Sequence, residues 1–168
     1  MANEIGVVGA GGWGTALAKL LADKGERVSL WCHGADSYHD IQNKRENCAY
    51  LPGIQLPHNV AVTQSLELAV ANKFLVICAV PSHAVREVFS IAAAQISPET
   101  LMLCGTKGLE EGTLRTMGEL FADILGAGNS RRQAFLSGPT FAIEVARGLP
   151  AAATVAGYAE EVAKLIQA

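Results

Sequence analysis

Residues 4–33 read EIGVVGAGGWGTALAKLLADKGERVSLWCH, and three of their glycines, at 9, 11 and 14, follow a short apolar run. A helical pattern of apolar residues comes next, and a second apolar run closes a β-α-β unit of about 30 residues. The glycine spacing is G-x-G-x-x-G. In this order of strand, turn, helix and strand, the motif is typical of dinucleotide-binding domains.

Each glycine has its own expected role in holding a pyrophosphate. Gly9 permits a tight turn, Gly11 removes a Cβ that would strike the pyrophosphate, and Gly14 lets the helix pack closely on the strand. Unpaired N–H groups at the helix start then face the phosphates, whose charge the helix dipole favours. Gly12 adds backbone freedom, and Trp13 either flanks the cofactor or is a packed aromatic. The alternative for the whole motif is a turn that needs glycine for shape alone.

The second strand lacks the carboxylate that usually binds the ribose of NAD. The sequence there is LWCHGAD, so Cys32 or His33 stands at the expected position, and Asp36 follows in a predicted loop. Without a carboxylate, nothing there repels the 2′-phosphate of NADP. We therefore expect NADP (as NADPH) to be tolerated and preferred, with NAD as the second cofactor. His33 is the expected phosphate donor, with Lys44 or Arg45 in reach; the alternative is a solvated His33.

Beyond this unit, short apolar runs continue to alternate with helical patterns. Runs without polar alternation, such as KFLVICAV at 73–80, are typical of parallel strands buried on both faces. The pattern predicts an α/β fold with a doubly wound, mostly parallel sheet of the Rossmann type. Strands are expected at 5–8, 28–31, 60–62, 73–80, 101–104 and 134–137. Helices are expected at 15–24, 84–96, 114–125, from about 140 and from 159, and residues 34–59 are expected to be irregular.

Length, composition and charge narrow the functional classes. The 168 residues suit one domain, so residues 1–168 are interpreted as a single NAD(P)-binding domain. The net charge of −3 and the pI near 5.8 argue against a nucleic-acid partner. No apolar run is long enough to span a bilayer, the first strand starts within five residues, and the four cysteines form no CxxC pair. These features predict a cytoplasmic protein without membrane insertion, and no metal-ligand spacing is present.

In a doubly wound sheet, ligands bind beyond the carboxyl ends of the strands, which singles out three further loops. In AVPSH, Pro81 is placed to flank a nicotinamide ring, and Ser82 is expected to cap the next helix. In CGTKGLEEG, Lys107 either binds a substrate phosphate or polarises a carbonyl, or is a surface lysine. In SGPTFAIEVARGLP, Gly138 permits close approach, and Thr140 either caps a helix or offers its hydroxyl to a ligand.

Taken together, these motifs resemble those of bacterial NAD(P)-dependent glycerol-3-phosphate dehydrogenases. The matching stretches, in order, are GAGGWGTALA, LWCH, NCAYLPGIQLP, AVPSH, TKGLEEGT and SGPTFAIEVARGLP. The resemblance covers nearly the whole chain, and TKGLE and SGPTFA are its most specific parts. It implies an oxidoreductase that reversibly reduces dihydroxyacetone phosphate to sn-glycerol 3-phosphate for phospholipid synthesis.

The resemblance also implies roles for individual residues. The resemblance places four residues at the cofactor: Gly12, Trp13, His33 and Ala142. Those that it places at the phosphate substrate are Gly138 and Thr140, and Lys107 would contact both ligands. A homodimer is expected for the full-length form.

The family's principal catalytic lysine lies in a second, all-helical domain, in a GAVKN-like segment that these 168 residues do not contain. That lysine is therefore expected beyond Ala168, and the sequence is expected to be the amino-terminal half of a longer enzyme. By itself this half should be inactive or slow, with Lys107 as an auxiliary catalytic residue. Two alternatives stay open. One is another two-domain Rossmann dehydrogenase, of the ketopantoate reductase or 6-phosphogluconate type, and the other is a non-catalytic nucleotide-binding regulator.

Overall fold

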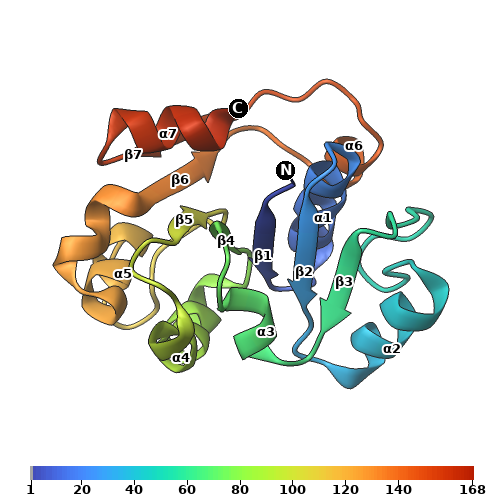
Figure 1. The fold of residues 1–168 in the computed structure, drawn as a ribbon, viewed down its shortest axis with the longest axis horizontal. Coiled ribbons are helices and arrows are strands. Elements are labelled where there is room, and N and C mark those ends of the chain that lie inside the picture. Colours follow the sequence, from blue (N-terminus) through green and yellow to red (C-terminus); the bar gives the residue numbers. More distant parts are fainter. Residues whose placement is uncertain (1) are drawn as a thin grey trace.

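The computed structural model describes residues 2–168, which contain one seven-stranded sheet in the order β3-β2-β1-β4-β5-β6-β7 (Figure 1). The strands are β1 (Glu4–Val8), β2 (Arg27–Trp31), β3 (Val60–Thr63), β4 (Leu75–Cys78), β5 (Leu101–Cys104), β6 (Gln133–Ser137) and β7 (Thr154–Gly157). Strands β1 to β6 are parallel, and β7 runs antiparallel to β6. The order 3-2-1-4-5-6 is that of dinucleotide-binding domains, which confirms the predicted fold class.

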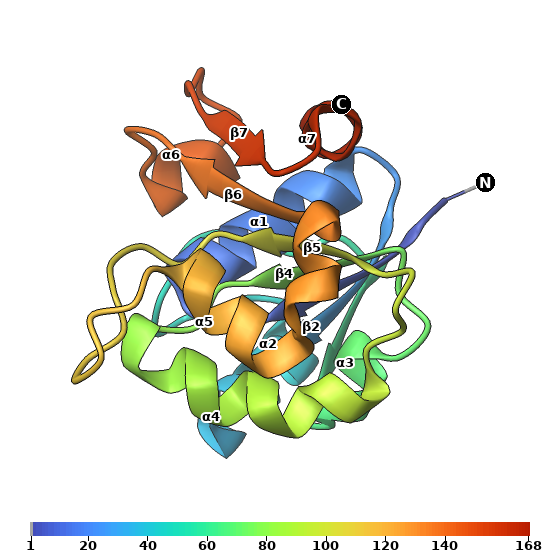
Figure 2. The ribbon, with the colours of Figure 1, turned by 90° about the vertical axis from the view of Figure 1, so that its left-hand side faces the viewer.

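Helices cover both faces of the sheet (Figure 2). They are α1 (Gly12–Asp23), α2 (Ala35–Lys44), α3 (Leu66–Val70), α4 (Ser82–Ala92), α5 (Met117–Leu125), α6 (Ala142–Ala146) and α7 (Glu160–Gln167). One apolar core packs α1, α2 and α7 on the sheet, and the other packs α3, α4 and α5 on the opposite face. The strands between them are buried on both faces, which explains their continuous apolar sequences.

The strand order reverses between β1 and β4, the two neighbours at the centre of the sheet. From β1 the chain proceeds outward through β2 and β3, and it then returns to place β4 on the other side of β1. At such a switch point the loops after the two strands diverge and leave a crevice beyond their carboxyl ends. The turn after β1 and the loop after β4 therefore face each other across this crevice.

Three sequence predictions about the helices and strands were wrong. Residues 34–59 are not wholly irregular, because their first part, including Asp36, forms α2. This helix was missed because it buries mainly Ile41, so its sequence shows only a weak helical pattern of apolar residues. The short α3, which Ser65 caps, was missed, as was the edge strand β7.

Within residues 2–168, none of the helices combines the length and the apolar character that a bilayer-spanning segment requires.

Candidate functional site

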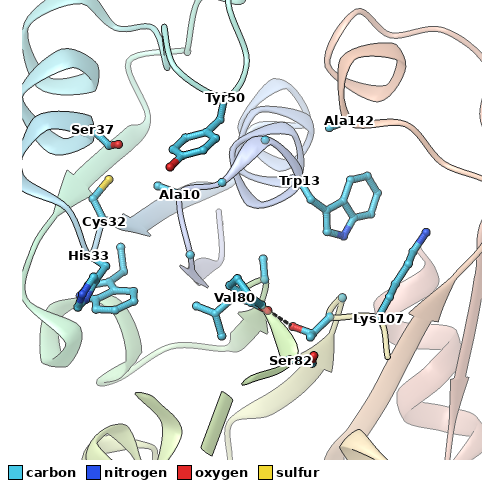
Figure 3. Close-up of a pocket in the computed structure, with 18 of the residues that line it drawn as sticks. Ala10, Trp13, Cys32, His33, Ser37, Tyr50, Val80, Ser82, Lys107 and Ala142 are labelled. Carbon is cyan, nitrogen blue, oxygen red and sulfur yellow. Dashed lines mark hydrogen bonds between the residues drawn. The ribbon is translucent and has the colours of Figure 1, made fainter. Parts of the chain in front are cut away.

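A cavity of about 740 Å³ lies beyond the carboxyl ends of the central strands (Figure 3). Its walls come from the turn after β1, the end of β2, the loops after β4, β5 and β6, and the segment that carries Tyr50. Ligand sites in proteins typically occupy roughly 300–1,000 Å³. The cavity therefore has a suitable size and lies at the expected switch point of the sheet.

Most of the predicted site residues line this cavity. They are Gly9, Gly11, Gly12, Trp13, His33, Pro81, Lys107, Thr140 and Ala142. Two predicted residues, Gly14 and Gly138, are absent from the described lining. Sequence reasoning missed Ser37, Tyr50 and Phe141, which do line it. Tyr50 belongs to the quoted stretch NCAYLPGIQLP, whereas Ser37 lies in the helix that was not predicted.

The principal catalytic lysine, expected beyond Ala168, falls outside the described residues and stays a prediction. Ala168 itself follows α7, and its carbonyl oxygen accepts a hydrogen bond from Nζ of Lys24 at 2.7 Å. It does not line the cavity. Of the two lysines assigned to catalysis, only Lys107 can therefore be placed in the site.

Two close backbone approaches shape the turn between β1 and α1. Gly9 has φ +119°, and a Cβ there would lie 2.8 Å from the carbonyl carbon and oxygen of Ala79. A Cβ at Gly14 would lie 1.8 Å from the carbonyl oxygen of Gly9. The tight turn and the close helix packing predicted for these two glycines are thus present, and they bring α1 directly against the end of β1.

Gly11 is glycine for a different reason. A Cβ there would meet no protein atom within 4 Å, and the residue lines the cavity. It precedes the first turn of α1, where N–H groups have no acceptor one turn earlier and no side chain caps the helix. Open space beside such N–H groups suits an anion such as a phosphate.

Gly12 packs closely, which corrects the expectation that it supplies backbone freedom. A Cβ at Gly12 would lie 2.8 Å from the carbonyl oxygen of Tyr50. The segment around Tyr50 therefore rests on the start of α1, and its phenol ring lies beside the cavity in Figure 3.

The helix caps expected in two loops are not formed. Pro81 occupies the N-cap of α4, so Ser82 becomes the first helical residue and lines the cavity instead. Phe141 occupies the N-cap of α6 without a side-chain cap, which leaves Thr140 free of the capping role. Thr140 lines the cavity, so the structure favours the second role that the sequence left open for it.

Lys107 reaches from the loop after β5 to the loop after β6. Its exposed Nζ donates to the carbonyl oxygen of Gly138 at 3.2 Å. Gly138 has φ +152°, and a Cβ there would lie 2.5 Å from the Ala152 carbonyl oxygen. Its close approach is therefore to the chain entering β7, and it affects the cavity through the contact with Lys107.

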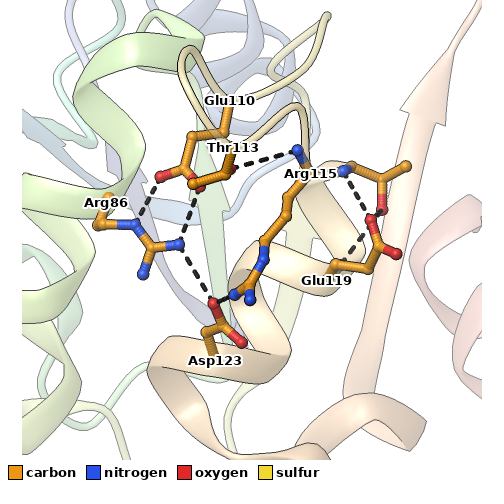
Figure 4. A network of polar contacts seen from close by, with 7 residues as sticks. Arg86, Glu110, Thr113, Arg115, Glu119 and Asp123 are labelled. Atoms are coloured by element: carbon orange, nitrogen blue, oxygen red, sulfur yellow. Dashed lines mark hydrogen bonds and ion pairs between the residues drawn. The ribbon is translucent and has the colours of Figure 1, made fainter.

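A polar network fixes the loop that follows Lys107 (Figure 4). Arg86 on α4 donates to Glu110 through Nε at 2.5 Å and Nη2 at 2.9 Å, and the Thr113 hydroxyl donates to the same carboxylate at 2.5 Å. Arg86 and Arg115 also both pair with Asp123 on α5. The loop is thereby held between two helices, and the Arg86 guanidinium, with Thr113, lowers the pKa of Glu110 to about 2.

The Glu110 contacts are expected to weaken in acid. The pKa of Glu110 in the folded state lies below its ordinary value of 4.5, so the stabilisation is present above pH 4.5 and is lost as the pH falls through about 2. Denaturant unfolding of the wild type and Glu110→Gln between pH 7 and 3 measures this, and the stability difference should shrink below pH 4.5. Glu111→Gln, on the same loop, is the control. A difference that stays constant with pH would contradict the role of Glu110.

The charges near the cavity suit an anionic ligand. His33 is exposed at the end of β2 beside Trp31, with ring centroids 5.6 Å apart, and Lys107 supplies a cation on the opposite side. Burial raises the pKa of the Cys32 thiol to about 11, so this group is uncharged near neutral pH. No Asp or Glu side chain that the structure describes lies in the lining.

Metal-binding groups are not clustered in the described chain. Among residues 2–168, no three His, Cys, Asp or Glu side chains are grouped closely enough to hold a metal ion.

A doubly wound sheet with an open glycine turn at its switch point defines a dinucleotide-binding domain of the Rossmann type. Residues 4–163 match the family model described as "NAD-dependent glycerol-3-phosphate dehydrogenase N-terminus". The chain belongs to this family, and the resemblance found in the sequence is confirmed.

Individual relatives agree with this assignment. The chain is 41% identical over 167 residues to a glycerol-3-phosphate dehydrogenase [NAD(P)+] of Geobacter sp. (strain M21), covering 99% of this chain and 50% of that protein. It is 46% identical over 161 residues to one of Anaeromyxobacter sp. (strain K), covering 96% and 48%. The crystal structure of glycerol-3-phosphate dehydrogenase from Coxiella burnetii superposes with a TM-score of 0.90 at 34% identity, covering 98% and 50%.

The chain thus spans about half the length of the relatives it matches. The comparisons favour this family over the two alternatives that the sequence left open, another two-domain dehydrogenase and a regulatory module.

Proposed function

We propose that the chain is the cofactor-binding part of a glycerol-3-phosphate dehydrogenase that prefers NADP. The whole enzyme reduces dihydroxyacetone phosphate to sn-glycerol 3-phosphate for phospholipid synthesis. The observation that carries the proposal is the open space beside Gly11 at the start of α1, in a cavity that is lined by Lys107 and His33 and, among the side chains described, by no carboxylate. Family membership supplies the reaction class.

The cavity fits a nicotinamide dinucleotide in four respects. The turn at Gly9–Gly14 offers unpaired N–H groups to a diphosphate, and we assign His33, which lines the cavity just after β2, as the donor to a 2′-phosphate. The indole Nε1 of Trp13 is buried without a hydrogen-bond partner in the described chain, which suits an acceptor on a ligand. Pro81, assigned to the nicotinamide ring, and Ala142, assigned to the cofactor by the resemblance, also line the cavity.

The bound cofactor supplies the hydride, and the protein supplies position and electrostatic field. The ammonium group of Lys107, held near Gly138, attracts the substrate phosphate and stabilises negative charge on the carbonyl oxygen. Thr140 also lines the cavity and offers its hydroxyl to the substrate. The principal proton-donating lysine is assigned, by the family resemblance, to a segment beyond Ala168.

The proposed activity is tested by NADPH oxidation with dihydroxyacetone phosphate, measured on this chain and on a full-length form. We expect turnover by the full-length form and little or none by the chain alone. In the full-length form, Lys107→Ala should raise the KM for dihydroxyacetone phosphate and lower kcat. Robust turnover by the chain alone would refute the assigned lysine, and a Lys107→Ala variant with unchanged constants would refute the role of Lys107.

His33 is expected to set the preference for NADPH over NADH. A charge-assisted hydrogen bond contributes about 1.5–3 kcal/mol, and because His33 is exposed we expect only a tenfold loss of NADPH affinity in His33→Ala. NADH affinity should stay within about twofold, because NADH lacks the 2′-phosphate. Fluorescence titration measures both constants. His39→Ala, an exposed histidine on α2 outside the cavity lining, is the matched control; equal losses for the two cofactors would contradict the assignment.

A cytoplasmic location and a homodimer of the full-length form are also proposed. The four cysteines of the described chain are free, which suits a reducing compartment. Cell fractionation tests the first proposal, and sedimentation of the full-length form tests the second.

A further inference from the structure

Asn47, in the segment between α2 and β3, makes a set of hydrogen bonds to the glycine turn. The residue is 1% exposed, and its Nδ2 donates to the carbonyl oxygen of Ala10 and to Oγ1 of Thr15, each at 2.8 Å. Its Oδ1 accepts from the backbone N–H of Tyr50 at 3.2 Å. The amide orientation is determined, because the Ala10 oxygen can only accept and the Tyr50 N–H can only donate.

The contact with Ala10 also fixes the direction of the Gly11 N–H, in a residue that lines the cavity. A trans peptide unit is planar, so its C=O and N–H groups point in opposite directions. When Asn47 fixes the Ala10 carbonyl, it also fixes the N–H of Gly11, which belongs to the same peptide. The second donated bond ties the same side chain to Thr15, on the buried side of the first turns of α1. The side-chain amide of Asn47 thus fixes the position of the glycine turn relative to the start of α1.

We propose that Asn47 is a positioning residue for the cofactor diphosphate. It holds the Ala10–Gly11 peptide so that the N–H of Gly11 stays directed toward the space beside the start of α1. This inference rests on the proposed function, since it assumes that a dinucleotide occupies the cavity. It concerns orientation only, because Asn47 is not part of the cavity lining.

The chain offers a matched control at the other end of the same helix. Asn59 donates through Nδ2 to the carbonyl oxygens of Ala22 and Glu26, at 2.8 and 2.7 Å. It is the same residue type with the same kind of bond, near the carboxyl end of α1 and outside the cavity lining. If the hydrogen bonds of the two asparagines only stabilise the fold, variants of both should change stability and cofactor affinity alike. If Asn47 positions the diphosphate site, only variants of Asn47 should lose NADP⁺ affinity.

The test compares two nucleotides on the wild type, Asn47→Ala, Asn47→Asp and Asn59→Ala. NADP⁺ contains the diphosphate, and adenosine 2′-phosphate does not. Asn47→Asp keeps the shape and the acceptor for Tyr50 but loses both donated hydrogens. Calorimetry gives the two dissociation constants, and thermal unfolding without ligand gives the stability of each variant. If Asn47→Ala does not fold, Asn47→Ser, which retains one donor, takes its place.

We expect both Asn47 variants to bind NADP⁺ about tenfold more weakly, because the loss of one such hydrogen bond has an effect of this size. Their affinity for adenosine 2′-phosphate should be unchanged. Asn59→Ala should lower the unfolding temperature and leave both affinities at the wild-type values. Equal loss for the two nucleotides, or an equal loss of NADP⁺ affinity in Asn59→Ala, would overturn the positioning role while leaving the proposed function standing. A wild-type chain that binds neither nucleotide would overturn both.

Discussion

Gly11→Ala is expected to remove cofactor binding while leaving the fold intact. The added Cβ meets no protein atom within 4 Å and the backbone has φ −72°, so the unfolding free energy should change by less than about 0.5 kcal/mol. The same methyl group occupies the space assigned to the diphosphate. We expect NADPH affinity to fall at least 100-fold, which is about 2.7 kcal/mol. Calorimetric titration and chemical denaturation measure the two effects separately.

Gly128→Ala is the matched control for this variant. Its added Cβ also meets nothing within 4 Å, and Gly128 lies in the short 3-10 helix before β6, outside the cavity lining. This variant should bind NADPH like the wild type. Wild-type NADPH affinity in a folded Gly11→Ala variant would contradict the role given to the glycine turn.

Gly14→Ala is expected to destabilise the fold itself. Its Cβ would overlap the carbonyl oxygen of Gly9, a backbone atom that cannot rotate away, so α1 must shift from the end of β1. Such overpacking should cost about 3 kcal/mol, of which the better helix propensity of alanine recovers up to about 1 kcal/mol. For a domain of this size, a net loss near 2 kcal/mol lowers the unfolding temperature by roughly 4–8 °C. Calorimetry without ligand measures it.

Gly118→Ala on α5 is the control for Gly14→Ala. It also replaces a helical glycine by alanine, but the atoms that its Cβ would meet first belong to side chains and not to the backbone. Its Cβ would come within 2.8 Å of the Tyr158 hydroxyl and 3.3 Å of the Phe135 ring, side-chain atoms that can move aside. It should therefore be far less damaging than Gly14→Ala. Equal unfolding temperatures for these two variants would contradict the role given to the contact between Gly14 and Gly9.

The sequence predicted the glycine turn and the order of elements because their signals are local. The run before Gly9 and the helical pattern after Gly14 sit within a few residues of the turn itself, so the turn could be read without knowing the rest of the fold. The strands β4 and β5 were found because burial on both faces makes them continuously apolar. Helix α2 was missed because most of its residues are polar, and Ile41 is the one buried residue among those of its side chains that the structure describes.

The remaining parts of the site depend on contacts between distant residues. The close approach of Gly12 to Tyr50, and of Gly138 to Ala152, joins segments that no local pattern relates. The expected caps at Ser82 and Thr140 were displaced by one residue, since the backbone of Pro81 and Phe141 took the N-cap positions. The role of Asn47 was not predicted, because the two oxygens to which its side chain donates lie more than 30 residues earlier in the chain.

Titration calorimetry of the folded wild-type chain with NADPH, and then with NADH, tests the central claim most directly. If the amides at the start of α1 hold a cofactor diphosphate, NADPH should bind at a single saturable site, with NADH binding more weakly. A folded sample that releases or absorbs no heat with either nucleotide, and whose unfolding temperature neither nucleotide raises, would contradict the claim.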